Sequence, residues 1–297
     1  MINKMGLTAK DRLLIINADD FGITEGSNEA IVNLFENKSI TSASIINAYP
    51  ASNNAMDVSI RKGIEYIGVH LTLTSSDLHP CTPVFQQQSL SSLITDEGYF
   101  HTDISLLEKN ADEKEVRIEL ESQIRKSILK GIDPTHLDSH GGSVMGLLSG
   151  RDFLEVVFDL CEKYRLPFNL PKRILEQPFF NADQLKLFQK RMASAYDRKI
   201  VLIDDMVSLP YCSGPNLEYS RLKQQLIDIL QRLKPGVTQL TVHPSILTDQ
   251  LKEITHCYEE REMEYRLLQD DDVKRLIKRE QIKLITWKAI RDLQRSI

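Results

Sequence analysis

Acidic and imidazole side chains follow several short apolar segments of this sequence, at points where strands are expected to end. In parallel α/β architectures such strand ends meet on one face, so residues far apart in sequence come together there. Two neighbouring carboxylates repel each other, and the pKa of one rises unless a cation intervenes. The pattern therefore predicts a catalytic site for a divalent cation. The residues concerned are Asp19, Asp20, His70, Asp138, His140 and His243.

The cation is assigned to Asp20, His70 and His140, because carboxylate plus imidazole is a suitable ligand set and three protein ligands leave positions open for water and substrate. Magnesium and zinc are the candidate ions. Asp19 is then free to act as general base toward a water activated by the cation. His243 is assigned to protonate the leaving amine or to hold another group that does.

Three further residues are given supporting roles. Asp138 is expected to accept a hydrogen bond from a ligand histidine and so to orient it. Arg173 and Tyr211 lie near predicted strand ends and loops, and are candidates for lining the substrate pocket.

Each residue also has an ordinary explanation. Asp19 or Asp20 could cap the following helix, and a lone histidine in an apolar strand, as at His70, is often a hydrogen-bonded core residue. His136 is expected to point away from the face that carries Asp138 and to be structural. The functional interpretation is favoured because it explains why all these residues stand at predicted strand ends. Capping and core packing would explain each residue separately and make their common placement a coincidence.

The remaining histidines and the cysteines are given no role. The four cysteines form no C-x-x-C pair, so the sequence suggests neither a zinc knuckle nor a disulfide framework, and we interpret them as ordinary thiols. The residues set aside in this way are His79, His101, His256, Cys81, Cys161, Cys212 and Cys257.

Short apolar or β-branched segments alternate with helical patterns along the chain, which favours a parallel sheet with crossover helices. Seven or eight such units indicate an α/β fold resembling a (β/α) barrel, complete or distorted, although an open doubly wound sheet gives the same alternation. The predicted strands are 13–18, 42–47, 66–71, 135–138, 168–170, 200–203, 237–242 and 282–285. The predicted helices are 25–37, 114–130, 152–164, 182–195, 217–233 and 271–279.

Length and charge narrow the remaining possibilities. We expect one domain, 1–297, with an insertion at about 77–112 over the active face. The net charge is -5 and the 37 basic residues are scattered, which argues against a nucleic-acid partner. There is no signal-peptide core and no run of the roughly 20 apolar residues that a membrane-spanning helix needs, so we expect a cytoplasmic protein without a membrane partner.

Four motifs together resemble the YdjC-like family, which includes the chitooligosaccharide deacetylases. They are NADDFG at 17–22, GVHLTLT at 68–74, PTHLDSH at 134–140 and VHP at 242–244. The resemblance implies a (β/α)-barrel-like fold as in polysaccharide deacetylases, and removal of an N-acetyl group from a small N-acetylated saccharide. It also implies one divalent metal held by the residues matching Asp20, His70 and His140, with Asp19 as base, and suggests a homodimer.

One departure leaves the substrate open. Family members of the chitooligosaccharide type continue the DSH segment with a further H-x-H pattern, whereas Gly141 and Gly142 follow His140 here. Glycine lets the backbone approach a ligand closely, so the pocket is expected to be wider or reshaped. Two alternatives stay open: metal-dependent hydrolysis of another bond, and a sugar-binding or regulatory protein that has lost turnover.

Overall fold

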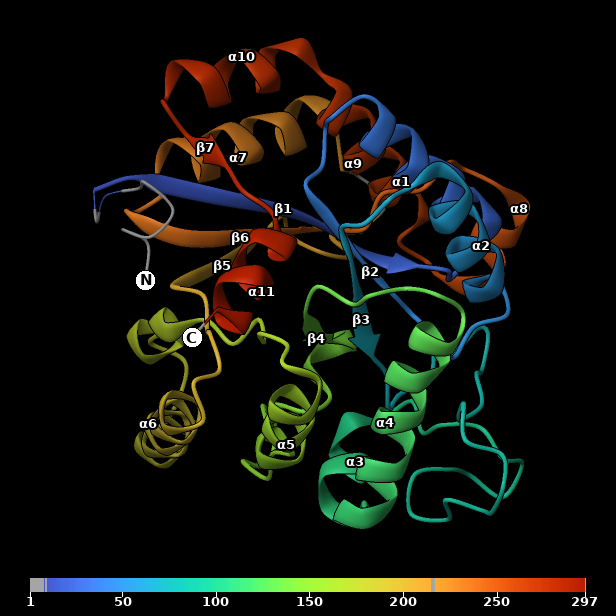
Figure 1. The fold of residues 1–297 in the computed structure, drawn as a ribbon. Helices are drawn as coiled ribbons and strands as arrows, with labels where there is room; N and C mark the ends of the chain where they lie inside the picture. The colour runs from blue at the N-terminus through green and yellow to red at the C-terminus, as the bar shows by residue number, and fades with distance from the viewer. Residues whose placement is uncertain (1–7, 9, 215–216, 297) are drawn as a thin grey trace.

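Among the residues that the structure describes, seven parallel strands form one sheet in the order β4-β3-β2-β1-β6-β5, with β7 paired to β1 (Figure 1). The computed structural model describes residues 8, 10–214 and 217–296. Because all the strand pairs are parallel, the carboxyl ends of the strands lie together at one end of the sheet. The strands are β1 (Arg12–Phe21), β2 (Ser42–Ile45), β3 (Ile67–Leu71), β4 (Leu137–Ser139), β5 (Asp205–Ser208), β6 (Gly236–Val242) and β7 (Lys283–Leu284).

The sheet curls into an incomplete barrel. Between β4 and β5 its wall, as far as the structure describes it, is held together only by isolated bridges. Isolated bridges join Leu137 on β4 to Phe168, and Phe168 to Leu202, which lies just before β5. The predicted strands at 168–170 and 200–203 are therefore single bridges. Pro167 and Pro171 flank Phe168 and have no N–H group to donate, which limits a longer ladder there. The predicted α/β, barrel-like and distorted fold is confirmed.

Helices cover most of the outer face of the sheet, whereas the last helix of the chain begins against its inner face (Figure 1). All six predicted helices are present, with ends that differ by a few residues. Among the described residues, none of the helices has the length and apolar character to cross a membrane. The helices are α1 (Glu25–Glu36), α2 (Ser52–Lys62), α3 (Ile104–Asn110), α4 (Glu113–Leu129), α5 (Leu154–Tyr164), α6 (Ala182–Asp197), α7 (Tyr219–Gln231), α8 (Asp249–Ile254), α9 (Tyr258–Gln269), α10 (Asp271–Arg279) and α11 (Trp287–Arg295).

Side chains of β1 alternate between two environments. Leu14 and Ile16 belong to the apolar layer between the sheet and helices such as α1 and α7. Leu13 and Ile15 instead contact the cluster around Trp287, the first residue of α11. This period of two places the next odd-numbered side chains of β1 on the same face as Leu13 and Ile15.

The region predicted as an insertion is mostly irregular up to α3. It is fastened to α4, because the backbone N–H groups of Val84 and Phe85 each donate to the carboxylate of Glu119 at 2.9 Å. Glu119 is buried, and these hydrogen bonds offset the free-energy cost of removing its carboxylate from water. The segment thus packs against the side of the barrel that carries α4.

Candidate active site

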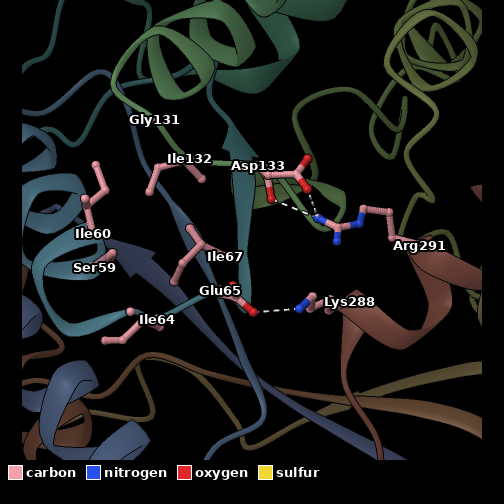
Figure 2. A pocket seen from close by; sticks show the side chains of 11 residues that line it. Ser59, Ile60, Ile64, Glu65, Ile67, Gly131, Ile132, Asp133, Lys288 and Arg291 are labelled. Carbon is pink, nitrogen blue, oxygen red and sulfur yellow. Dashed lines mark hydrogen bonds and ion pairs between the residues drawn. The ribbon is translucent and has the colours of Figure 1, made fainter.

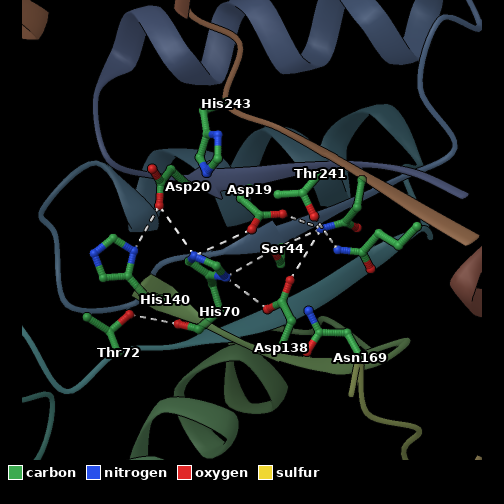
Figure 3. Close-up of polar contacts among 12 residues, drawn as sticks. Asp19, Asp20, Ser44, His70, Thr72, Asp138, His140, Asn169, Thr241 and His243 are labelled. Atoms are coloured by element: carbon green, nitrogen blue, oxygen red, sulfur yellow. Dashed lines mark hydrogen bonds and ion pairs between the residues drawn. The ribbon is translucent and has the colours of Figure 1, made fainter. Parts of the chain in front are cut away.

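A backbone irregularity at the end of β1 turns two consecutive carboxylates toward the same space. The register with β2 shifts between Ala18 and Phe21, and Asp20 has a left-handed φ of 62°. Bulges redirect side chains near active sites, and aspartate tolerates left-handed backbone better than most residues. Asp19 Oδ2 lies 3.8 Å, and Asp20 Oδ1 3.5 Å, from Nε2 of His70 (Figure 3). Regular alternation would have pointed one of them away.

Asp138 on β4 orients His70 on β3. The two residues are register partners, and Nδ1 of His70 lies 2.9 Å from Oδ1 of Asp138. A carboxylate at one ring nitrogen fixes the tautomer and leaves the other nitrogen free for a cation. Asn17 donates through Nδ2 to Asp19 Oδ1 at 2.7 Å and to Asp138 Oδ2 at 3.3 Å. One buried amide thus orients both carboxylates.

Asp20, His70 and His140 offer three ligand atoms that lie within 4.8 Å of one another. Nδ1 of His140 is 3.3 Å from Oδ1 of Asp20, and 24% of the His140 side chain is exposed. Among the described residues, the buried Oδ1 of Asp20 has no hydrogen-bond donor. Such an oxygen is costly to bury, and a cation between it and the two imidazoles would remove that cost. The donor set therefore fits a divalent metal.

Three buried carboxylates set the charge of His70. Burial alone would lower the pKa of this imidazole, but Asp138, Asp19 and Asp20 raise it to about 10. Burial raises the pKa of Asp19 well above its ordinary value, against the charge of His70 and together with the repulsion of Asp138. A site that draws a proton onto an imidazole so strongly also attracts a metal cation, because either one neutralises the same carboxylates.

Arg261 on α9 belongs to this site, although no sequence motif indicates it. The residue is 3% exposed, and its Nη2 donates to Asp20 Oδ2 at 2.6 Å and to the Tyr211 hydroxyl at 2.7 Å. Burial alone would raise the pKa of Asp20, but Arg261 and His140 hold it well below its ordinary value. Asp20 therefore stays ionised, with Oδ2 occupied and Oδ1 turned toward the histidines.

His243 follows β6 and lies beside Asp20 (Figure 3). Its ring packs on Tyr211 with centroids 4.8 Å apart, and its backbone N–H donates to the carboxylate of Glu264. Burial lowers the pKa of His243 to about 3 and raises that of Glu264 to about 7. His243 is therefore neutral at pH 7 in the metal-free chain, and it can donate a proton only after receiving one.

The structure does not bring Arg173 to this cluster. Arg173 lies in the 3-10 helix η3 (Lys172–Glu176), and its Nη2 donates to the carbonyl of Pro235 at 2.8 Å. Pro235 immediately precedes β6, whereas His243 immediately follows it. The length of β6 therefore separates Arg173 from the metal-ligand group.

The expectation that His136 points away from Asp138 is wrong. Residues two apart on a strand share a face, and Nε2 of His136 lies 3.5 Å from Oδ2 of Asp138. The buried ring stacks on Trp287, with centroids 4.7 Å apart and planes 12° from parallel. His136 thus joins the carboxylate cluster to the apolar interior of the barrel.

The interpretation of all four cysteines as ordinary thiols is also corrected. Cys212 and Cys257 form a disulfide with their Cα atoms 5.0 Å apart, across a separation of 45 residues. No local motif reveals such a pair, because only the fold brings the loop after β5 to the start of α9. Cys81 and Cys161 are buried free thiols, as expected.

A cavity of about 430 Å³ lies at the start of β3, away from these residues (Figure 2). Its charged side chains pair with one another: Lys288 Nζ lies 2.6 Å from the carboxylate of Glu65, and Arg291 Nη1 lies 2.9 Å from that of Asp133. Their charges are balanced within the cavity, in contrast to the carboxylate-rich group at the other ends of the strands.

Comparison with known proteins agrees with the motifs. A family model described as YdjC-like protein matches residues 13–279. The chain belongs to the YdjC-like family. A carbohydrate deacetylase of Thermoanaerobacter pseudethanolicus is 28% identical over 280 residues, which cover 94% of this chain and 100% of that protein. A carbohydrate deacetylase of Enterococcus faecalis is 28% identical over 281 residues, or 94% and 98% of the two chains.

A solved structure agrees with the assignment of this chain to the YdjC-like family. The crystal structure of a candidate cellobiose-phosphate cleavage protein from Enterococcus faecalis superposes with a TM-score of 0.76 at 25% identity, and the match covers 94% of this chain and 99% of that one. The two chains therefore share their fold over nearly their whole lengths, and the family predicted from the four motifs is confirmed.

Proposed function

We propose that this YdjC-like protein is a metal-dependent hydrolase that removes the N-acetyl group from an amino sugar or a short N-acetylated oligosaccharide. The observation that carries the proposal is the convergence of Asp20, His70 and His140 on one point, with the carboxylate of Asp19 beside them. Two relatives that align over nearly their whole lengths are named carbohydrate deacetylases, and they supply the substrate class. The products are acetate and a free amine.

One divalent cation is proposed to bind Asp20, His70 and His140. When bound, it supplies a Lewis acid that polarises the acetyl carbonyl and lowers the pKa of a water molecule. A set of one carboxylate and two imidazoles suits zinc or another first-row transition ion better than magnesium, which prefers oxygen ligands and retains several waters. Zinc is therefore the first ion to test.

Asp19 is proposed as the general base. Asp20 is engaged by Arg261 at Oδ2 and faces the histidines with Oδ1. Asn17 binds Oδ1 of Asp19, which leaves Oδ2 of Asp19 to take the proton of the attacking water. Burial raises the pKa of Asp19, and a base whose pKa lies closer to the working pH is more effective.

The proton must then reach the leaving nitrogen. We assign this transfer to His243: because burial keeps its imidazole neutral at pH 7, it would take up the proton that Asp19 has received and pass it to the leaving nitrogen. Tyr211 packs against the ring and limits its orientation. Replacement of His243 by alanine is therefore expected to lower kcat more than it raises KM.

Acetate release from a series of N-acetylglucosamine oligomers tests the proposal directly. The purified protein is stripped with a chelator, divided, and assayed with no metal, with zinc and with magnesium. We expect release only after a metal is restored. The Asp19→Asn variant should lose roughly 10²–10⁴-fold in kcat, the usual contribution of a positioned general base.

Asp204→Asn is the matched control. Asp204 Oδ2 accepts a hydrogen bond from the N–H of Val237 at the opposite end of β6, so its replacement should leave acetate release nearly unchanged. Failure of the metal-loaded protein to release acetate from every oligomer would refute the deacetylase proposal. Saccharide binding that is equal in the native protein and Asp19→Asn, without turnover by either, would instead indicate a binding protein.

A further inference from the structure

The Cys212–Cys257 disulfide adjoins two residues of the proposed active site. Cys212 directly follows Tyr211, and Cys257 precedes Arg261 by about one helical turn at the start of α9. Arg261 donates to the Tyr211 hydroxyl at 2.7 Å and to Oδ2 of Asp20 at 2.6 Å. The disulfide therefore closes a chain of contacts that ends on a proposed metal ligand.

The segment that carries Tyr211 has little other support. Tyr211 is 48% exposed, and Cys212, Ser213 and Gly214 are exposed as well. Apart from the disulfide, the described contacts of this segment include the hydrogen bond from Arg261 to the Tyr211 hydroxyl and the packing of the Tyr211 ring on His243. The backbone N–H of Ser213 also donates to the carboxylate of Glu260. Exposed segments with few buried apolar contacts open at low free-energy cost. A covalent link to α9 would suppress such opening.

The two sulfur atoms differ in accessibility. Cys212 is exposed, whereas Cys257 is 4% exposed. Both residues line a surface cavity of about 430 Å³, together with Leu217 and His256. A small thiol or disulfide can therefore approach Cys212 from solvent, and exposed disulfides are typically the exchangeable ones.

We propose that Cys212 and Cys257 form a reversible thiol–disulfide pair that controls how firmly Tyr211 and Arg261 are held against Asp20. The oxidant is a low-molecular-weight disulfide. Its S–S bond and two protein S–H bonds break, while one protein S–S bond and two small thiols form. The two electrons and two protons that leave the protein pass to that reagent. The consequence for catalysis rests on the proposed deacetylase function, whereas the consequence for the loop does not.

Equilibration of the protein in buffers of graded thiol–disulfide ratio tests the pair. Alkylation followed by mass spectrometry should count two reactive cysteines in the unfolded oxidised protein, Cys81 and Cys161, and all four after reduction. Hydrogen exchange of residues 209–214 and of the first turns of α9 should be faster in the reduced protein. The value of kcat/KM should fall by about 3–10-fold, less than the roughly 10–100-fold typical when a residue that orients a ligand is removed.

Two variants separate this effect from general reduction. Cys212→Ser replaces an exposed residue and should behave as the reduced protein in every buffer. Cys161→Ala removes a buried free thiol and should keep the full response. The proposal is overturned if both cysteines stay free at every buffer ratio, if hydrogen exchange is the same in both forms, or if kcat/KM does not follow the change in exchange. If neither form releases acetate while exchange still responds, the deacetylase function fails and the control of the loop stands.

Discussion

A residue larger than glycine at Gly68 on β3 is expected to destabilise the protein, although the backbone there does not require glycine. Its φ is not positive, so the constraint is purely one of space. A Cβ atom added at Gly68 would lie 2.3, 2.4 and 2.7 Å from three atoms of the His136 ring. A normal contact between carbon atoms begins near about 3.5 Å, so the ring would have to retreat by roughly 1 Å.

Two neighbours limit how far the His136 ring can retreat. It stacks on Trp287 at 4.7 Å, and its Nδ1 lies 3.0 Å from the hydroxyl of Thr135. Trp287 is itself fully buried and donates to Gln239 at 2.9 Å. Overpacking of a core costs about 1–3 kcal/mol, and the upper part of that range, about 2–3 kcal/mol, is expected for Gly68→Ala. For a chain of 297 residues this lowers Tm by roughly 3–5 °C.

Urea unfolding followed by fluorescence measures this change at the relevant place, because Trp287 is the only tryptophan of the chain. In a His136→Ala background the added methyl group meets no ring, so Gly68→Ala should cost at least about 2 kcal/mol less there. Gly26→Ala is the comparison: its φ is also not positive, and its nearest new contacts, at 3.0 Å, are tight but longer than those at Gly68, so it should destabilise the protein less. A Gly68→Ala protein as stable as the native one, with unchanged fluorescence, would refute the reasoning.

Three other predictions concern charge and cross-linking. Asp138→Asn should weaken zinc binding by roughly 10–100-fold in calorimetry, because the carboxylate that orients His70 becomes a neutral amide; unchanged affinity would exclude that role. Glu264 has a folded-state pKa of about 7, above its ordinary 4.5, so the folded chain retains a proton that the unfolded chain has lost. The contribution of Glu264 to the free energy of unfolding should therefore fall by roughly 3 kcal/mol as pH rises from 4.5 to 7, measured in urea titrations as a change of that size in the difference between the native protein and Glu264→Gln. Reduction of the disulfide, which closes a loop of 45 residues, should lower the free energy of unfolding by up to about 4 kcal/mol. The Tm of the native protein should therefore fall when a thiol is added, whereas the Tm of Cys212→Ser should not change.

Periodic patterns predicted the α/β class and the parallel sheet from the sequence, but they left a barrel-like and an open doubly wound sheet both possible. Burial on both faces makes a parallel strand rich in apolar and β-branched residues, as in 13–18 and 237–242, and β1 and β6 lie there. The missed helix α9 shows the limit of this approach. Its buried residues include Glu260, Arg261 and Glu264, so charged side chains interrupt the apolar face that identifies a helix. Short segments near proline are a second limit: 168–170 has the composition of a strand but forms only isolated bridges.

The candidate site divides in the same way. The sequence indicated Asp20, His70 and His140 because they stand at predicted strand ends, and parallel strands bring such ends together. Only the tertiary structure decided how these side chains face one another. The irregularity at Asp20 departs from strand alternation, Arg261 arrives from a helix more than two hundred residues later, and Cys212 meets Cys257 through folding alone. Local sequence patterns reflect interactions between residues that are close together in the chain. These contacts instead join residues that are far apart in sequence, and only the complete fold brings them together.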